Sequence, residues 1–369
     1  MDNCVIPHGY KATALGIIPQ EWEVMLLGNL SNSISSGRNK HRDAHGQYPV
    51  FGSTGIIGYS STYEYEGPVI LVARVGANAG TLNFASGQYD VSDNTLIITI
   101  KQNVYDYNFA YNQLTHYKLN KLVFGSGQPL ITSKQLKNIR IPVPPLAEQR
   151  KIAEVLGVWD KAIEKQARLI EKLALRKRAL MQRLLSAKLR LPGFSEPWKK
   201  VKLGDVAELY QPQTIQSEDL SQTGYPVYGA NGLIGYYNNY NHEYPQVVIT
   251  CRGSSCGTVN FTPGKCWITG NAMVLNVDNN RDVNKSFFYY LISNSSFVNL
   301  ISGSGQPQIV RQPLLKFELR IPPLKEQTAI AEVLTAADRE IDLAKEQLER
   351  LRRQKRGLMQ QLLTGKKRI

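Results

Sequence analysis

Two glycine-framed clusters are the first candidates for chemistry in this chain of 369 residues. Gly76–Gly80 directly follows the β-prone run Val69–Ala73, and Gly253–Gly257 follows the run Val247–Thr250. Both clusters lack the GxGxxG spacing of a dinucleotide-binding loop, and no helical pattern follows either of them. Glycine permits backbone conformations that bring a turn close to a ligand. We therefore interpret the clusters as tight turns that present polar side chains.

Three of the four cysteines form a second candidate site. Cys251, Cys256 and Cys266 are separated by four and then nine residues, which is not the paired CxxC spacing of a zinc site. His242 is the only histidine nearby. A zinc site is the alternative, but we interpret these cysteines as small buried residues.

Familiar catalytic motifs are missing from the sequence. It contains no GxxxxGK[ST] phosphate loop, no HExxH zinc helix, no GxSxG nucleophile elbow and no HxE–PCxxC deaminase pair. The Asn/Asp-Pro-Pro-aromatic tetrapeptide of amino-methyltransferases is missing as well. These absences predict a chain without a catalytic centre of its own.

The whole sequence repeats itself with a period of about 178 residues. Two copies of this length indicate two domains rather than a solenoid. His41, His45 and Cys251 have no match in the other copy, which argues further against a hidden active site. The matching segments are Tyr48–Gly52 and Tyr225–Gly229, Gly80–Phe84 and Gly257–Phe261, Gly125–Pro129 and Gly303–Pro307, and Pro144–Leu156 and Pro322–Leu334.

Each copy begins with about 120 residues that are rich in Gly, Tyr, Asn, Ser and Thr, namely 20–143 and 196–321. Short β-prone runs between turn residues predict strands, and Asn108–Leu119 and Ser286–Ser293 are expected to form short helices. We therefore predict a mixed, mostly β domain in each copy. The predicted strands are Val69–Ala73, Thr95–Ile100, Val247–Thr250 and Ala272–Leu275.

The rest of each copy is predicted to be one long helix, over 146–186 and 324–364, because proline pairs precede it and Pro192-Gly193 or Gly365 follows it. Apolar residues alternate in steps of four and three over more than four heptads, which is a coiled-coil pattern. Lys177 and Lys355 interrupt the two seams at the same relative place and could set the register. The alternative is two separate helices, each packed on its own β domain. The residues expected to pair the helices are Leu156, Trp159, Ile163, Ile170, Leu173, Leu180, Leu334, Ile341, Leu348, Leu351 and Leu358.

The formal net charge of +14 is concentrated in these helices. Residues 147–190 carry a net +7 and residues 325–369 a net +4, which leaves +3 for the remainder. Such a surface is either a solvated face or one that attracts DNA phosphates or an acidic partner. The sequence shows no secretory signal and no apolar run of the roughly 18 residues that a membrane span needs. We expect a cytoplasmic protein with no membrane partner.

Taken together, these motifs resemble the specificity subunit of type I restriction–modification systems. The resemblance rests on GIIPxEWE at Gly16–Glu23, the YPV-aromatic-G and GSGQP segments, and IPxPPLxEQxxIAxxL leading into a long helix. It covers nearly the whole chain. It implies an α+β fold in which two β-rich mixed target recognition domains are joined by two long antiparallel coiled-coil helices, with an internal pseudo-twofold repeat. The expected boundaries are 1–145 and 191–323 for the recognition domains, and 146–190 and 324–369 for the central and C-terminal spacer helices.

The resemblance also implies a non-catalytic subunit that reads a split, asymmetric site in double-stranded DNA. Two modification (methyltransferase) subunits would dock on it, and restriction (translocase–nuclease) subunits would complete the complex. No cofactor or metal is implied for this chain, since S-adenosylmethionine, ATP and Mg would be bound by the partner subunits. The alternatives are the specificity module of a type II-like restriction–methylation enzyme and a nonspecific nucleic-acid-binding scaffold.

Base recognition requires side chains with directed donors and acceptors, such as Arg for guanine and Asn or Gln for adenine. The loop Arg38–Arg42 is a candidate for contact with DNA. Its counterpart in the second copy, Gln211–Gln222, has a different sequence, as two separate specificities would require. The alternative role for each candidate is to stabilise a turn or to remain solvated. The candidate DNA-binding residues are Arg38, Lys40, Arg74, Asn78, Gln128 and Lys134 in the first domain, and Asn231, Arg252, Ser255, Gln306, Gln308 and Arg311 in the second.

Overall fold

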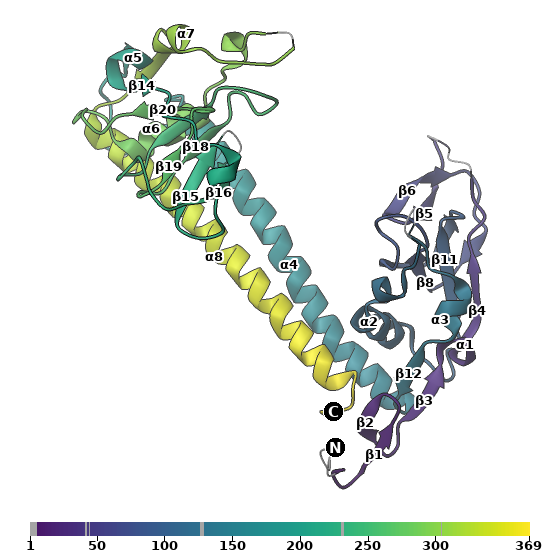
Figure 1. Ribbon diagram of the computed structural model, residues 1–369. Coiled ribbons are helices and arrows are strands. Elements are labelled where there is room, and N and C mark those ends of the chain that lie inside the picture. The colour runs from purple at the N-terminus through teal and green to yellow at the C-terminus, as the bar shows by residue number, and fades with distance from the viewer. Residues whose placement is uncertain (1–5, 41–42, 44, 126–128, 230–231, 304) are drawn as a thin grey trace. The chain divides into compact units, whose positions relative to one another are not determined.

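The chain forms two units, each of which holds one β-rich region and parts of both long helices (Figure 1). The computed structural model describes residues 6–40, 43, 45–125, 129–229, 232–303 and 305–369. The first unit comprises residues 1–167 and 347–369, and the second comprises residues 168–346. The two long helices are α4 (Leu146–Leu184) and α8 (Leu324–Leu362).

The first unit is built on a four-stranded antiparallel sheet in the order β4-β11-β8-β9. All five residues of β8 are buried, and the first four alternate between two apolar clusters. Ile70 and Val72 face the main core, while Val69 and Leu71 face a smaller cluster that contains Tyr89. Because both faces of this strand are covered, its sequence is continuously apolar instead of alternating. The strands of this sheet are β4 (Ser31–Ser36), β8 (Val69–Ala73), β9 (Leu82–Ala85) and β11 (Thr95–Ile100).

A second sheet of the first unit has the order β6-β5-β10-β7, in which β5 and β10 run parallel. Two small antiparallel pairs complete the region, β1 with β2 and β3 with β12. The strands are β1 (Tyr10–Thr13), β2 (Gly16–Pro19), β3 (Glu23–Leu26), β5 (Tyr48–Gly52), β6 (Gly55–Ser60), β7 (Tyr65–Glu66), β10 (Gln88–Val91) and β12 (Arg140–Val143). The helices are α1 (Leu27–Leu30), α2 (Tyr107–Tyr117), α3 (Ser133–Lys137) and the 3-10 helix Leu119–Leu122.

The second unit repeats this plan with the sheet order β14-β20-β17-β18. The central strand β17 is again buried throughout, with Val247 and Ile249 on the main core and Val248 on a smaller cluster. The smaller sheet has the order β16-β15-β19, and β13 pairs with β21. The strands are β13 (Lys199–Lys202), β14 (Glu208–Tyr210), β15 (Tyr225–Gly229), β16 (Gly232–Tyr237), β17 (Val247–Thr250), β18 (Val259–Phe261), β19 (Trp267–Ile268), β20 (Ala272–Asn276) and β21 (Glu318–Ile321). The helices are α5 (Leu203–Val206), α6 (Lys285–Ser293), α7 (Arg311–Leu315) and the 3-10 helices Ser217–Asp219 and Val298–Leu300.

Both predicted short helices are confirmed as α2 and α6, and the four predicted strands are confirmed as β8, β11, β17 and β20. Each short helix begins at a residue whose side chain accepts a hydrogen bond from the first turn. Asp106 accepts from the amide of Phe109, and Asn284 accepts from the amide of Phe287, both at 2.9 Å. These N-caps satisfy amide groups that the helix itself cannot pair.

Each core is completed by the start of one long helix and the end of the other. In the first unit, Ile152 and Leu156 of α4 share the main core with Met359 and Leu362 of α8. In the second unit, Ile330 and Leu334 of α8 share the main core with Leu184 of α4. The helices therefore run antiparallel and pack together, as the resemblance implies. Among the described residues, no helix combines the length and apolar character that crossing a bilayer requires.

The two lysines that interrupt the apolar seam each form an ion pair with an aspartate of the other helix. Lys355 contacts Asp160 at 2.6 Å in the first unit, and Lys177 contacts Asp338 in the second. Both pairs are related by a shift of 178 residues along the sequence. The surroundings of the two ion pairs differ, because in the second unit Tyr290 of α6 also donates a hydrogen bond to Asp338 at 2.7 Å.

We expect replacement of Lys355 by Leu to raise the free energy of unfolding by about 1 kcal/mol, because a polar residue in a coiled-coil seam lowers stability in exchange for a defined register. The Lys355 side chain is 14% exposed, whereas Asp160 is 54% exposed and remains solvated without its partner. Urea unfolding of the full chain measures the change, with Lys165→Leu on the exposed face of α4 as the control. A lower stability would mean that the ion pair contributes more than the apolar contact that replaces it.

Candidate nucleic-acid interface

Four loop segments of the first unit meet at one end of the sheet β4-β11-β8-β9. They are residues 36–40, 74–80, 91–95 and 129–131, and we call them the first loop cluster. The amide of Gly76 donates to the carbonyl of Pro129, and the amide of Arg74 donates to the carbonyl of Asn94, both at 2.9 Å. The amide of Asn39 donates to the carbonyl of Val91 at 2.9 Å. Backbone hydrogen bonds thus connect all four segments.

The second unit contains an equivalent group, the second loop cluster, which comprises Gln211 and residues 251–257, 269–271 and 307–309. The amide of Gly253 donates to Pro307 at 3.0 Å, and the amide of Cys251 donates to Asn271 at 3.0 Å. The side-chain amide of Gln211 donates to the carbonyl of Gly270 at 3.0 Å. Both glycine-framed clusters therefore lie at the same edge of equivalent sheets, as turns within a larger loop surface.

The last glycine of each turn requires a left-handed backbone. Gly80 has φ +88° and Gly257 has φ +89°. A Cβ at Gly80 would lie 2.6 Å from the amide nitrogen of Asn120, so glycine also permits a close approach of the chain there. The interpretation of these segments as tight turns is consistent with this geometry.

The predicted residues of the first domain lie in or beside the first loop cluster. Arg38, Lys40 and Asn78 are exposed. The Nη1 atom of Arg38 lies 3.7 Å from the Oε1 atom of Glu64. Arg74 is half-buried, and its guanidinium donates to the hydroxyl of Ser36 at 3.2 Å, so it also connects two segments of the cluster. The remaining candidates are Lys134, which is exposed on α3 just after the cluster, and Gln128, which lies outside the described residues.

The second loop cluster contains three of the six candidates from the second domain, Arg252, Ser255 and Gln308. Arg252 pairs through its backbone with Gln308, and both side chains are exposed. Arg311 instead begins α7 and lines a groove of about 680 Å³ with residues of α5. The other candidates are Gln306, which is exposed, Ser255, which is half-buried, and Asn231, which lies outside the described residues, as do His41 and Arg42 of the Arg38–Arg42 loop.

Sequence reasoning did not identify the third segment of each cluster, which is the turn before β11 or β20. Asn94 and Asn271 occupy these turns, and their carbonyls accept the amides of Arg74 and Cys251. Turn-forming residues directly before an apolar strand are the signal that would have pointed to them. Their position makes them further candidates for contact with a ligand at this edge.

Two of the three cysteines are small buried residues as expected, Cys251 and Cys266, whereas Cys256 is half-buried. Cys251 belongs to the main core of the second unit and Cys266 to its smaller cluster. Burial raises the pKa of the Cys251 thiol to about 11, so the thiol stays protonated at neutral pH. His242 makes hydrogen bonds with Tyr210 at 2.9 Å and Asn241 at 2.6 Å, and burial lowers its pKa. Within the described ranges, no three His, Cys, Asp or Glu residues are placed to hold a metal ion.

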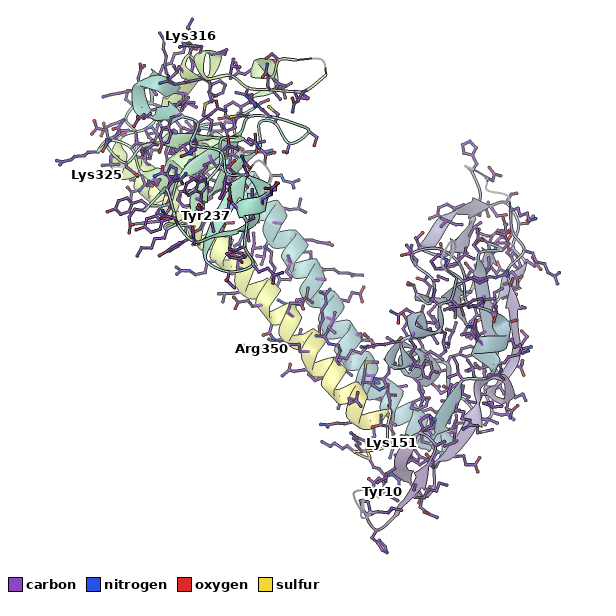
Figure 2. All side chains as sticks on the ribbon, in the orientation of Figure 1. Tyr10, Lys151, Tyr237, Lys316, Lys325 and Arg350 are labelled. Carbon is purple, nitrogen blue, oxygen red and sulfur yellow. The ribbon has the colours of Figure 1, made fainter. Side chains whose placement is uncertain are left out.

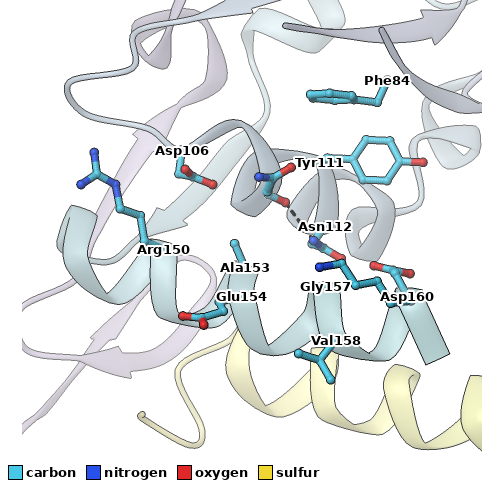
Figure 3. A pocket seen from close by; sticks show the side chains of 12 residues that line it. Phe84, Asp106, Tyr111, Asn112, Arg150, Ala153, Glu154, Gly157, Val158 and Asp160 are labelled. Carbon is cyan, nitrogen blue, oxygen red and sulfur yellow. Dashed lines mark hydrogen bonds between the residues drawn. The ribbon is translucent and has the colours of Figure 1, made fainter. Parts of the chain in front are cut away.

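A groove of mixed polar and apolar lining lies beside the start of α4, and Figure 3 shows the side chains that line it. It measures about 840 Å³, and its charged residues include Asp106, Arg150 and Glu154. The corresponding groove of the second unit measures about 340 Å³. Asn112 lines the larger groove at the position where the second copy has Tyr290, a much larger side chain.

The long helices also carry exposed cations. Lys151, Lys325 and Arg350 are all exposed, and Figure 2 shows their side chains projecting from α4 and α8. Some cations near the seam are already paired, such as Arg176 with Glu340. The helices therefore combine internal ion pairs with cations that remain available to a polyanion or an acidic protein.

A family model described as the type I restriction modification DNA specificity domain matches the chain twice, at residues 19–174 and 195–353. The chain is 24% identical to the type I restriction enzyme MjaVIII specificity subunit of Methanocaldococcus jannaschii, over 95% of this chain and 94% of that protein. It is 26% identical to the putative MjaX specificity subunit of the same organism, over 98% of this chain and 97% of that one. The crystal structure of a type I restriction–modification S subunit from M. genitalium has a similar fold, with a TM-score of 0.65, 20% identity, and coverage of 93% of this chain and 96% of that chain. This chain therefore belongs to the family of type I restriction–modification DNA specificity subunits, which is a non-catalytic family.

Proposed function

We propose that this chain selects the DNA site of a type I restriction–modification complex by reading a split, asymmetric sequence, one half with each loop cluster. The observation that carries this proposal is the occurrence of two equivalent loop clusters with different exposed side chains. Equivalent frames place two sets of side chains in equivalent positions, while their different chemistry favours two different half-sites.

The base-reading residues in this proposal are the exposed members of the clusters, including Arg38, Asn78, Arg252 and Gln308. An arginine recognises guanine through two hydrogen bonds, and Asn or Gln recognises adenine in the same way. Arg74 is the exception, because its bond to Ser36 favours a supporting role. Lys40 and Lys134, which are exposed, would contact phosphates in this proposal and so position the protein on the duplex.

We propose residues 1–145 and 191–323 as the recognition domains, and 146–190 and 324–369 as the helices that space them. Two modification subunits would dock at the two grooves beside the starts of α4 and α8, since the grooves are related by the sequence repeat. Restriction subunits would complete the complex in the cytoplasm. S-adenosylmethionine, ATP and Mg belong to the partner subunits in this proposal, and none of them to this chain.

The decisive experiment is methylome sequencing of cells that express this chain together with its modification subunit. We expect one split, adenine-methylated motif that disappears when the gene for this chain is deleted. Methylation without a sequence preference, or methylation that persists after the deletion, would contradict the proposal. Equal binding of the purified complex to all duplexes, with a steep salt dependence, would instead indicate a nonspecific nucleic-acid scaffold.

Single substitutions in the second loop cluster should alter one half-site only. We expect Arg252→Ala to weaken binding of the complex by about 1–3 kcal/mol and to relax the preference at one base pair. By contrast, Lys134→Ala in the first domain should weaken binding to all sequences. It should also lower the slope of the logarithm of the binding constant against the logarithm of the salt concentration by about 1. Titration of labelled duplexes at several salt concentrations measures both effects. Arg320→Ala, which removes an exposed cation of β21 outside the cluster, is the matched control. An effect of Arg252→Ala on both half-sites would be inconsistent with separate readers.

A further inference from the structure

The Pro-Pro-Leu-x-Glu-Gln segment that begins each long helix is not explained by DNA reading alone. Its glutamine fixes the loop before the adjacent short helix. In the first unit, Gln149 donates to the carbonyls of Val104 and Pro144 and accepts from the amide of Asp106, each at 2.9 Å. Gln327 makes the same three bonds in the second unit, with Asp282, Pro322 and Asn284.

The glutamate of this segment binds an arginine that follows the other long helix. In the second unit, Arg190 Nε donates to Glu326 Oε1 at 2.6 Å, and Nη2 donates to Oε2 at 2.8 Å. The same guanidinium also donates to the carbonyl of Glu196 at 2.9 Å. The side chain of Glu326 is only 1% exposed, so its charge must be compensated by this arginine instead of by water.

The first unit has an equivalent pair. Arg368 Nε donates to Glu148 Oε1 at 3.1 Å, and Nη2 donates to Oε2 at 2.9 Å. Trp22 Nε1 also donates to Glu148 Oε2 at 3.1 Å, and Glu21 accepts from Arg368 at 2.7 Å. The Glu148 side chain is 7% exposed. Burial and additional partners separate these pairs from ordinary surface ion pairs, which contribute little.

The two pairs are reciprocal, and we call them the helix clamps. Glu148 lies in the first turn of α4 and Glu326 in the first turn of α8, while Arg190 follows α4 and Arg368 follows α8. Each clamp therefore ties the end of one long helix to the start of the other, and a shift of 178 residues relates the two clamps. A two-point bond between a guanidinium and a buried carboxylate permits little change in distance or angle, because any displacement leaves a buried charge unpaired.

We propose that Glu148 and Glu326 are positioning residues that make the chain strict about the number of unread base pairs between the two half-sites, an inference that rests on the proposed function. One base pair more or less moves a half-site by about 3.4 Å and rotates it by roughly 35° about the duplex axis. A loop cluster can follow such a change only if its β-rich region shifts relative to the helices. The clamps oppose this shift at the point where each β-rich region joins both helices.

The test is the spacer length of the methylated motif in cells that express Glu148→Gln or Glu326→Gln with the modification subunit. Glutamine keeps the size and an acceptor oxygen but removes the charge that holds the arginine. We expect unchanged half-sites and at least a 10-fold rise in methylation of sites whose spacer is one base pair longer or shorter. Glu346→Gln, an exposed position further along α8 and outside the groove beside its start, should keep the strict spacer of the unaltered chain.

A core variant separates positioning from general loss of stability. Leu314→Ala opens a cavity in the core of the second unit and should reduce methylation at all sites without changing the spacer. Arg190→Lys keeps the charge but loses the two-point bond, so it should relax the spacer even if Glu326→Gln fails to fold. A strict spacer in the folded clamp variants, or a relaxed one in Leu314→Ala, would overturn the inference. If the unaltered chain produces no split motif, the proposed function fails instead.

Discussion

A charged carboxylate that is buried away from water needs a cation and hydrogen bonds to compensate its lost hydration. One such carboxylate lies in the first turn of each long helix. Glu326 is almost completely buried and is held by two hydrogen bonds from Arg190. Glu148 is held in the same way by Arg368, with Trp22 as a further donor. Because each arginine follows the opposite helix, neither β-rich region can be completed by its own copy of the repeat. The same exchange occurs in the apolar cores, since each core contains residues from the start of one long helix and the end of the other.

The sequence predicts the parts of the fold that depend on neighbours along the chain. Proline pairs and a sustained apolar seam define the long helices to within two residues of their observed ends. Continuous apolar runs identify β8 and β17 because both faces of these strands are covered. By contrast, β10 has the sequence QYDV and pairs in parallel with β5. No pattern in the sequence of either strand predicts this pairing.

In the candidate site, too, the features that depend on neighbours along the chain can be predicted, and those that depend on distant contacts cannot. The glycine-framed turns and the GSGQP segments are evident from the repeat, and the backbone bond from Gly76 to Pro129 brings them together. Which arginines remain exposed is not evident, because that depends on partners from other loops, as with Arg74 and Ser36. The helix clamps join residues 136 and 220 positions apart, and no local pattern indicates such a contact. The repeat was informative here, since Glu148 and Glu326, and Arg190 and Arg368, occupy matching positions.

The loop clusters are connected largely through backbone groups, from Gly76 to Pro129 in one unit and from Gly253 to Pro307 in the other. Hydrogen bonds of this kind do not depend on the identity of the side chains that the loops display. The exposed residues can therefore be exchanged at little cost to the free energy of folding, while residues such as Gly80 and Glu326 cannot. The chain thus separates a frame that tolerates few substitutions from a display surface that tolerates many, and new sequence preferences can arise without a new fold.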